Sequence, residues 1–171
     1  MAVSVEELIT EAERFLAENY DMKLGIPIKR NNRLRNTLGW FQHSDRDGAL
    51  DIEINGKLMD YASRTEVIDV LRHELIHYAL YSTGRSYQDG CVEFEDELKK
   101  HVVSSTDVSI LFGPIVRFKC EKCGKSGYTE TISVLKKHER CKTRCCKARL
   151  VNVRKDVIYG DKKEAAELCT Y

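Results

Sequence analysis

Hydrophobic residues near the N-terminus recur with the spacing of one face of a helix. They are Leu8, Ile9, Ala12, Phe15 and Leu16. Spacings of three and four residues bring such side chains to one side of an α-helix. Ser4 and Glu7, just ahead of this set, form a capping-box pattern, in which the two residues satisfy backbone N–H groups at a helix start. The pattern predicts a helix from about 5 to 19.

Three short segments after this helix are typical of β-strands. Residues 25–30 form a short apolar run that contains Pro27, and proline is tolerated in edge strands because it cannot donate to a sheet. Residues 38–42 and 49–54 flank a polar stretch that ends in Gly48, which is the arrangement of a hairpin. We expect a small antiparallel sheet.

Two further helices are predicted after the hairpin. Ser63 and Glu66 repeat the capping-box pattern, and a broad apolar surface follows. Gly84 is suited to end this helix, because glycine readily adopts the left-handed conformation at a helix C-terminus. Residues 94–102 resemble a shorter helix. The apolar surface of the first of these helices comprises Val67, Ile68, Leu71, Leu75, Ile76, Tyr78 and Ala79.

The character of the chain changes at Gly113 and Pro114. Residues 1–112 alternate helical and strand patterns and predict an α+β domain large enough to bury a core. Residues 113–160 are short, basic and rich in cysteine, and this segment is too small to fold on its apolar residues alone. Residues 161–171 are a tail in which we find no functional signal.

The composition is that of an ordinary globular protein, with 42% hydrophobic and 32% charged residues. No stretch approaches the roughly 20 apolar residues that a membrane helix needs. The acidic, amphipathic N-terminus is unlike a signal peptide. We therefore expect a cytoplasmic protein that does not associate with membranes.

The formal net charge of +1 conceals an uneven distribution. Residues 117–155 contain thirteen Lys or Arg against three Glu, a balance of +10, so the remaining residues sum to −9. The aromatic residues Phe118 and Tyr128 are interspersed in the basic segment. Such a segment is suited to contact phosphates, which predicts DNA or another nucleic acid as a partner.

The segment RHELIHY contains the pattern H-E-x-x-H at His73, Glu74 and His77. Residues four apart lie one turn apart on a helix, so both histidines can point at one metal ion. Glu74 is then placed to act as general base on a zinc-bound water. The alternative, three polar side chains on an apolar helix without a role, would be costly to bury. The pattern predicts a catalytic zinc site.

A catalytic zinc ion usually has three protein ligands and one open position. Cys91 is the favoured third ligand, because this lone cysteine in an acidic segment has no evident packing role; its alternative is a small buried apolar residue. The other residues that could serve are Asp89, Glu93, Glu95, Glu97 and His101.

A second metal site is predicted in the basic segment, where five of the seven cysteines lie within 27 positions. Cys120 and Cys123 have C-x-x-C spacing and are followed by Gly124, as in a structural zinc site. The second pair is irregular. We favour Cys141 with Cys146, while Cys145 could replace Cys146 and His138 could enter the site.

The order of these features resembles the SprT-like family of zinc metallopeptidases. The resemblance rests on LGWFQ at 38–42, VLRHELIHYAL at 70–80, DGCVEFEDEL at 89–98 and the cysteine segment from 118 to 150. It implies a small zincin-like domain followed by a zinc ribbon, with one catalytic and one structural zinc ion. In that family the third ligand is typically a histidine after Asp-Gly, and Cys91 stands at that position.

The resemblance implies proteolysis near DNA. We therefore expect a zinc metalloendopeptidase that hydrolyses peptide bonds of protein or peptide substrates, with Glu74 as base. A thiolate from Cys91 would make zinc a weaker Lewis acid. The alternative is a nucleic-acid-binding zinc-ribbon protein whose peptidase-like domain is degenerate and not catalytic.

Overall fold

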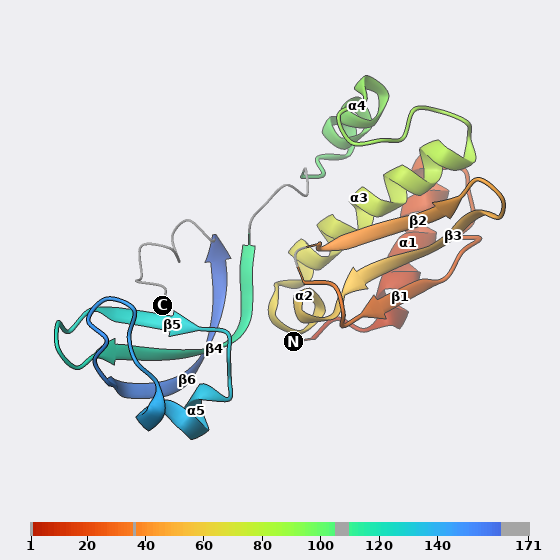
Figure 1. Ribbon diagram of the computed structural model, residues 1–171. Coiled ribbons are helices and arrows are strands. Elements are labelled where there is room, and N and C mark those ends of the chain that lie inside the picture. The colour runs from red at the N-terminus through yellow and green to blue at the C-terminus, as the bar shows by residue number, and fades with distance from the viewer. Residues whose placement is uncertain (1, 36, 105–109, 162–171) are drawn as a thin grey trace. The chain divides into compact units, whose positions relative to one another are not determined.

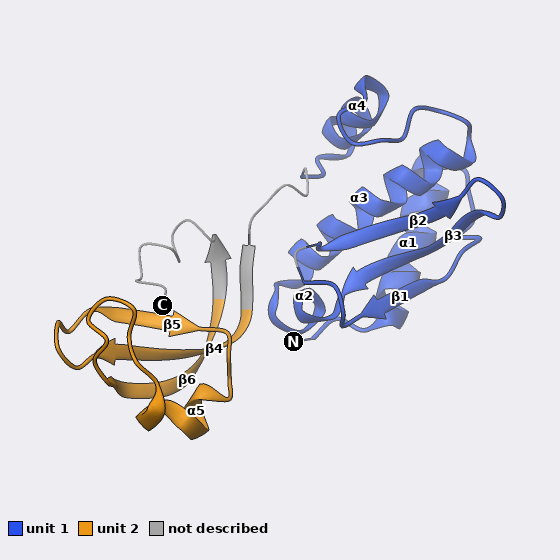
Figure 2. Ribbon diagram, in the orientation of Figure 1, with its two compact units in different colours: residues 1–108 blue, residues 109–171 orange. Residues whose placement is uncertain are grey.

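The computed structural model describes residues 2–35, 37–104 and 110–161, with the backbone alone at 110–112 and 159–161. The chain separates into two compact units, Met1–Val108 (unit 1) and Ser109–Tyr171 (unit 2), which Figure 2 colours separately. None of the helices in the described residues is long and apolar enough to cross a membrane. The predicted boundary after residue 112 falls inside a strand, Ile110–Cys120.

Unit 1 begins with α1 (Val5–Tyr20), which confirms the first predicted helix. The capping box is formed: the Ser4 side chain accepts from the Glu7 N–H at 3.2 Å, and Glu7 accepts from the Ser4 N–H at 3.3 Å. The apolar face of α1 is buried through Leu8, Ala12, Phe15 and Leu16. The apolar face was predicted from its periodicity, and α1 packs on α3.

The sheet of unit 1 has the strand order β1-β3-β2, with β1 at Ile28–Asn31, β2 at Gly39–Ser44 and β3 at Gly48–Asn55. The predicted hairpin is confirmed, since β2 and β3 pair antiparallel. The expected antiparallel sheet is wrong for β1, which pairs with β3 in the parallel direction. The sheet is mixed because the central strand β3 pairs in the parallel direction with β1 and in the antiparallel direction with β2.

Asn55 holds the connection that makes this arrangement possible. The segment between β1 and β2 must pass the end of β3, and the buried Asn55 amide donates to the carbonyls of Leu34 at 3.0 Å and Thr37 at 2.9 Å. The Asn55 side-chain oxygen also accepts from Lys57 N–H and caps a short helix that we did not predict, α2 (Gly56–Tyr61). One amide therefore fixes both the crossover and the next element.

The central element of unit 1 is α3 (Arg64–Ser82), which is buried along most of its length. Figure 1 shows α1 and α3 on one face of the sheet. The Ser63–Glu66 capping box is formed at its start. At its end Gly84 adopts a φ of +70°, and Arg85 N–H reaches the Leu80 carbonyl at 2.9 Å, so Gly84 ends the helix as predicted.

After a loop, α4 (Val92–His101) packs against α3. The predicted helix was 94–102, so α4 begins two residues earlier and ends one residue earlier than predicted.

Unit 2 is an antiparallel sheet of β4 (Ile110–Cys120), β5 (Ser126–Thr129) and β6 (Leu150–Asp161) in the order β5-β4-β6. A short helix, α5 (Val134–Lys137), and one 3-10 turn, His138–Arg140, lie between β5 and β6 in the chain. The buried core is small and consists of Val116, Phe118, Val134 and Leu150.

Candidate metal centre

The two histidines of α3 converge on one point. His73 and His77 are 1% and 9% exposed, and their Nε2 atoms lie 3.1 Å apart. The helix brings them together because residues four apart lie one turn apart. Two nitrogens that face each other at this distance are suited to share one cation.

Asp89, in the loop before α4, completes a group of three ligand atoms. Its Oδ1 lies 3.3 Å from His73 Nε2 and 3.6 Å from His77 Nε2. Zinc bonds of about 2.0–2.2 Å at tetrahedral angles separate ligand atoms by about 3.3–3.6 Å. The two distances from Asp89 match that separation and the distance between the histidine nitrogens is about 0.2 Å shorter, so a small adjustment of the rings fits the three donors to one small divalent ion and leaves a fourth position open.

The ring of His77 is oriented by its second nitrogen. Nδ1 contacts the Tyr87 carbonyl oxygen, which can only accept, so Nδ1 carries the proton and Nε2 presents its lone pair. Phe94 of α4 stacks on His77 with centroids 4.0 Å apart and meets the edge of His73 at 5.1 Å. The histidines are thus held by a carbonyl on one side and an aromatic ring on the other.

Burial keeps both histidines neutral. It lowers the pKa of His73, an effect that the negative charge of Asp89 opposes, and it also lowers the pKa of His77. Neutral imidazole is the form that binds a metal ion. The site therefore needs no deprotonation of histidine at neutral pH.

Glu74 lies beside the histidines without joining the group. Its Oε2 accepts from the Phe41 N–H of β2 at 2.9 Å, and the residue is 4% exposed. Burial raises the pKa of Glu74 to about 8. β2 comes so close that a Cβ on Gly39 would lie 2.7 Å from Glu74 Oε1. Glycine at 39 is thus required for this approach of strand and carboxylate.

A cavity of about 320 Å³ opens over these residues. The outer strand β2 contributes Trp40 and Phe41 to its wall, and the loop before α4 contributes Tyr87 and Gln88. Trp40 is 53% exposed. The candidate ligands therefore face a space that a substrate can enter.

Cys91, the predicted third ligand, lies outside the group of three. It is the N-terminal cap residue of α4, and it lines a separate hollow with Arg85 and Ser86. Asp89 lies beside the two histidines instead, and Gly90, with φ at +81°, forms the turn between Asp89 and Cys91. Metal binding by Cys91 stays a prediction.

The other predicted alternatives have different partners. Glu93 accepts from the Ser86 N–H at 2.7 Å, and Glu95 accepts from the Gly90 N–H at 3.2 Å. Both bonds shape the loop that carries Asp89. Glu97 and His101 bond to each other at 3.1 Å.

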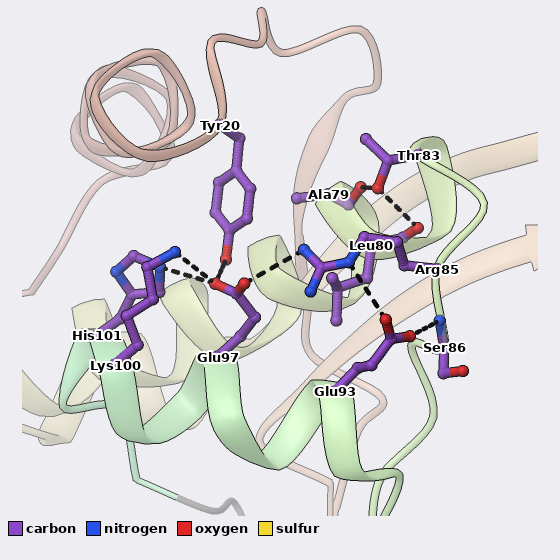
Figure 3. A network of polar contacts seen from close by, with 10 residues as sticks. All are labelled: Tyr20, Ala79, Leu80, Thr83, Arg85, Ser86, Glu93, Glu97, Lys100 and His101. Atoms are coloured by element: carbon purple, nitrogen blue, oxygen red, sulfur yellow. Dashed lines mark hydrogen bonds and ion pairs between the residues drawn. The ribbon is translucent and has the colours of Figure 1, made fainter.

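Glu97 is the centre of a polar network that attaches α4 to the end of α1 and to the loop after α3 (Figure 3). Its carboxylate accepts from Tyr20 at 3.1 Å, Arg85 at 3.2 Å and Lys100 at 3.1 Å, besides His101. Burial alone would raise the pKa of Glu97, but these hydrogen bonds outweigh it and lower the pKa. Since α4 also carries Phe94, this network helps to hold the histidine site.

We expect Glu97→Gln to lower the free energy of unfolding by about 1–3 kcal/mol, because charged hydrogen bonds at a largely buried position are weakened. Urea denaturation measures this loss. Asp96→Asn on the same helix is the matched control, because the Asp96–Lys99 pair is exposed and should change stability by less than about 0.5 kcal/mol.

The effect should depend on pH. A folded-state pKa below the unfolded value stabilises the protein above the unfolded pKa, and this contribution is lost as the pH falls through the folded value. The stability difference between wild type and Glu97→Gln should therefore shrink as the pH falls below about 4. A difference that stays constant down to acid pH would contradict the role given to the Glu97 charge.

A second group of potential metal ligands lies in unit 2 and comprises Cys120, Cys123, Cys145 and Cys146. Three of these were predicted, and Cys145 joins where Cys141 was expected. Cys141 packs against the core of unit 2, and its thiol donates to the Lys137 carbonyl at 3.3 Å. His138 Nδ1 contacts the Leu135 carbonyl at 3.0 Å and is not in the group.

Several residues that shape the first site were not predicted. Gly39, Phe94 and the Tyr87 carbonyl act through contacts between distant segments, and only Gly39 left a local signal, as a glycine inside a strand pattern. Phe118, an aromatic residue of the segment predicted to contact nucleic acid, is 5% exposed in the core of unit 2.

Comparison with known proteins supports the family resemblance. The sequence profile of the SprT-like family matches residues 5–96, which include all of α3 and the loop with Asp89. A protein named "Protein SprT-like" from Streptococcus gordonii is 31% identical over 129 residues, covering 73% of this chain and 85% of that protein.

Proteins of the same name from two strains of Bacillus cereus are 32% and 36% identical, over 53% and 41% of this chain. The chain spans 59% and 43% of the length of these two relatives. No solved structure matches. Since the family profile covers more than half of the sequence, including the histidine helix, the chain belongs to the SprT-like family.

Proposed function

We propose that unit 1 is a zinc-dependent endopeptidase. The observation that carries this proposal is the arrangement of His73, His77 and Asp89 around one point, with the buried carboxylate of Glu74 beside it. Two imidazoles and one carboxylate are a common ligand set of catalytic zinc. A peptidase also needs a base next to the metal, and Glu74 is the carboxylate that the helix supplies.

The role that we propose for each side chain follows from its position. A bound zinc ion would supply a Lewis acid that activates water and polarises a peptide carbonyl. His73, His77 and Asp89 would hold it. Glu74, oriented by the Phe41 N–H, would accept the proton from the attacking water and pass it to the leaving amine.

The raised pKa of Glu74 suits this role. Burial favours its neutral form, whereas a nearby divalent cation favours the carboxylate. With these two effects opposed, Glu74 could accept a proton from water and return it to the leaving group.

The position of the outer strand β2 supports the proposal that the substrate is a peptide. It lies at the edge of the sheet, lines the cavity and presents the exposed Trp40. An extended peptide can add to such an edge through backbone hydrogen bonds. This recognition would read the backbone more than the side chains, so we expect unfolded or extended protein segments as substrates.

The proposal is tested with unfolded casein as the substrate. Zinc-loaded protein should release peptides, a chelator should stop the release, and added zinc should restore it. Residual cleavage after complete metal removal would indicate a contaminating or metal-independent activity and would contradict the proposal.

A second activity, nucleic-acid binding by unit 2, is supported by one face of its sheet. Arg117 pairs across the strands with Arg154 on one side and Tyr128 on the other, so these side chains share a face. The neighbouring Val116 and Phe118 point into the core. Arg117, Lys119 and Arg154 also line a groove of about 700 Å³.

Phosphates of a nucleic acid would meet this face, and Tyr128 could stack on a base. Unit 2 would then bring unit 1 to proteins held on DNA or RNA. The ion pair of Arg117 with Asp156, at 2.5 Å, offsets part of the positive charge.

We expect fluorescently labelled single-stranded DNA to bind with an affinity that falls steeply with salt. The triple variant R117A/K119A/R154A should lower the slope of log affinity against log salt by about 2, because each lost phosphate contact removes about 0.7. The matched control K23A/R33A/R46A removes three positive charges from unit 1. Equal slopes in the two variants would contradict binding through this face.

A further inference from the structure

Unit 2 contains two turns with the same backbone hydrogen bonds. In the first turn (residues 119–126), Cys120 N–H donates to the Lys125 carbonyl at 2.9 Å, and Gly124 N–H donates to the Cys120 carbonyl at 2.9 Å. In the second turn (residues 142–149), Thr143 N–H donates to the Ala148 carbonyl at 2.9 Å, and Lys147 N–H donates to the Thr143 carbonyl at 3.0 Å.

The match extends to the flanks and to the backbone angles. Lys119 pairs antiparallel with Ser126 before and after the first turn, and Lys142 pairs antiparallel with Arg149 around the second. The residue four positions after Cys120 and the residue four positions after Thr143 both have a positive φ, which is +70° at Gly124 and +55° at Lys147. The two turns are therefore equivalent position by position.

This equivalence aligns the potential ligands. Cys123 in the first turn corresponds to Cys146 in the second. Cys120 corresponds to Thr143, which cannot supply a thiolate. Cys145 corresponds to Lys122, a position that provides no ligand in the first turn. The second turn therefore lacks a cysteine where the repeat would put one and has an additional cysteine two residues later.

The four sulfurs nevertheless converge. Their ligand atoms all lie within 4.8 Å of one another, and Cys123 Sγ is 3.6 Å from Cys145 Sγ. Zinc–sulfur bonds of about 2.3 Å at tetrahedral angles separate sulfurs by about 3.8 Å. All four cysteines have free thiols. The group fits a tetrahedral ion of the type that binds four thiolates.

Thr143 has a different contact in this arrangement. It is 2% exposed, and its hydroxyl lies 3.3 Å from Cys120 Sγ. The same hydroxyl lies 3.4 Å from the Ala148 carbonyl. When Cys120 is a thiolate, only the hydroxyl can donate in the contact between them, so Thr143 would turn its proton from Ala148 to the sulfur and stabilise a ligand instead of supplying one.

We propose that unit 2 binds a structural metal ion through Cys120, Cys123, Cys146 and a displaced fourth ligand, Cys145, which substitutes for the ligand position occupied by Thr143. This inference concerns unit 2 and does not depend on the peptidase activity proposed for unit 1. The core of unit 2 is small, and such modules commonly depend on a metal ion for folding.

The test is a titration of the full chain with cobalt(II), whose thiolate charge-transfer absorption grows with the number of bound sulfurs. All variants carry Cys91→Ala, so that unit 1 contributes no cysteine ligand. Cys145→Ala should reduce the absorption per bound ion to about three quarters and weaken binding at least about tenfold. Cys141→Ala, the matched control, should change neither quantity.

The decisive variant is the double substitution T143C/C145A, which moves the cysteine to the repeat position. It should restore the four-thiolate absorption, and it should also restore folding if Cys145→Ala alone fails to fold. A double variant that behaves like Cys145→Ala would overturn the proposal. A loss in Cys141→Ala together with a normal Cys145→Ala would assign the fourth position to Cys141 and would also overturn it.

Discussion

Glu74→Gln is expected to lower the rate of casein cleavage by a factor on the order of 10²–10⁴, the usual contribution of a general base. Glutamine has the same shape and can still accept from the Phe41 N–H, but it cannot take a proton from water. Metal binding should persist, because Glu74 is outside the group formed by His73, His77 and Asp89.

Initial rates and zinc content are measured on the same preparations. The folded state should not be weakened, since the substitution removes a buried ionisable group that burial disfavours in its charged form. Glu13→Gln on the exposed side of α1 is the matched control and should leave the rate unchanged. Full activity of zinc-loaded Glu74→Gln would remove Glu74 from the reaction.

Asp89→Ala is expected to weaken zinc binding by unit 1 at least about 100-fold, because even the loss of a group that only supports a ligand costs about 10–100-fold. Its side chain is 73% exposed, so the substitution should not disturb the core. Competition with a coloured chelator measures the affinity. Unit 2 is kept out of the titration by the double substitution C120S/C123S.

Cys91→Ala is the comparison that decides between the two assignments of the third ligand. If Asp89 binds the ion, Cys91→Ala should retain wild-type affinity. If Cys91→Ala lost at least about 100-fold and Asp89→Ala did not, the thiolate would be the ligand, as predicted from sequence, and the loop would have to rearrange around Gly90.

Features fixed within a single helix could be predicted from the sequence. The capping boxes at Ser4 and Ser63 act within one turn, so the starts of α1 and α3 agreed with the structure. The convergence of His73 and His77 follows from the helical repeat in the same way. A local pattern predicts such features because the backbone conformation alone determines the geometry.

Features that depend on contacts between distant segments could not be predicted. The parallel pairing of β1 depends on how Asn55 holds the crossover, which leaves no trace in the alternation of apolar residues. The position of Asp89, and not Cys91, beside the two histidines depends on the path of the loop around Gly90. The grouping of Cys145 with Cys120, Cys123 and Cys146 depends on how two turns far apart in the sequence bring their sulfurs together.

The same distinction between local patterns and contacts of distant segments explains why the position of Phe118 was not predicted. Its position in a basic segment suggested contact with nucleic acid, but the alternation of β4 directs it into the core with Val116 and Leu150, while Arg117 and Lys119 line the groove. The composition of the segment predicted contact with a polyanion, which stays a prediction. Only the strand register separates the residues on that surface from those beneath it.

The central claim is that His73, His77 and Asp89 bind one zinc ion beside Glu74. Anomalous diffraction at the zinc edge, on crystals of the zinc-loaded protein, tests it most directly. The account predicts a peak within about 2.0–2.2 Å of His73 Nε2, His77 Nε2 and an Asp89 oxygen. A peak bonded to Cys91 Sγ instead of Asp89, or no peak at the two histidines, would contradict it.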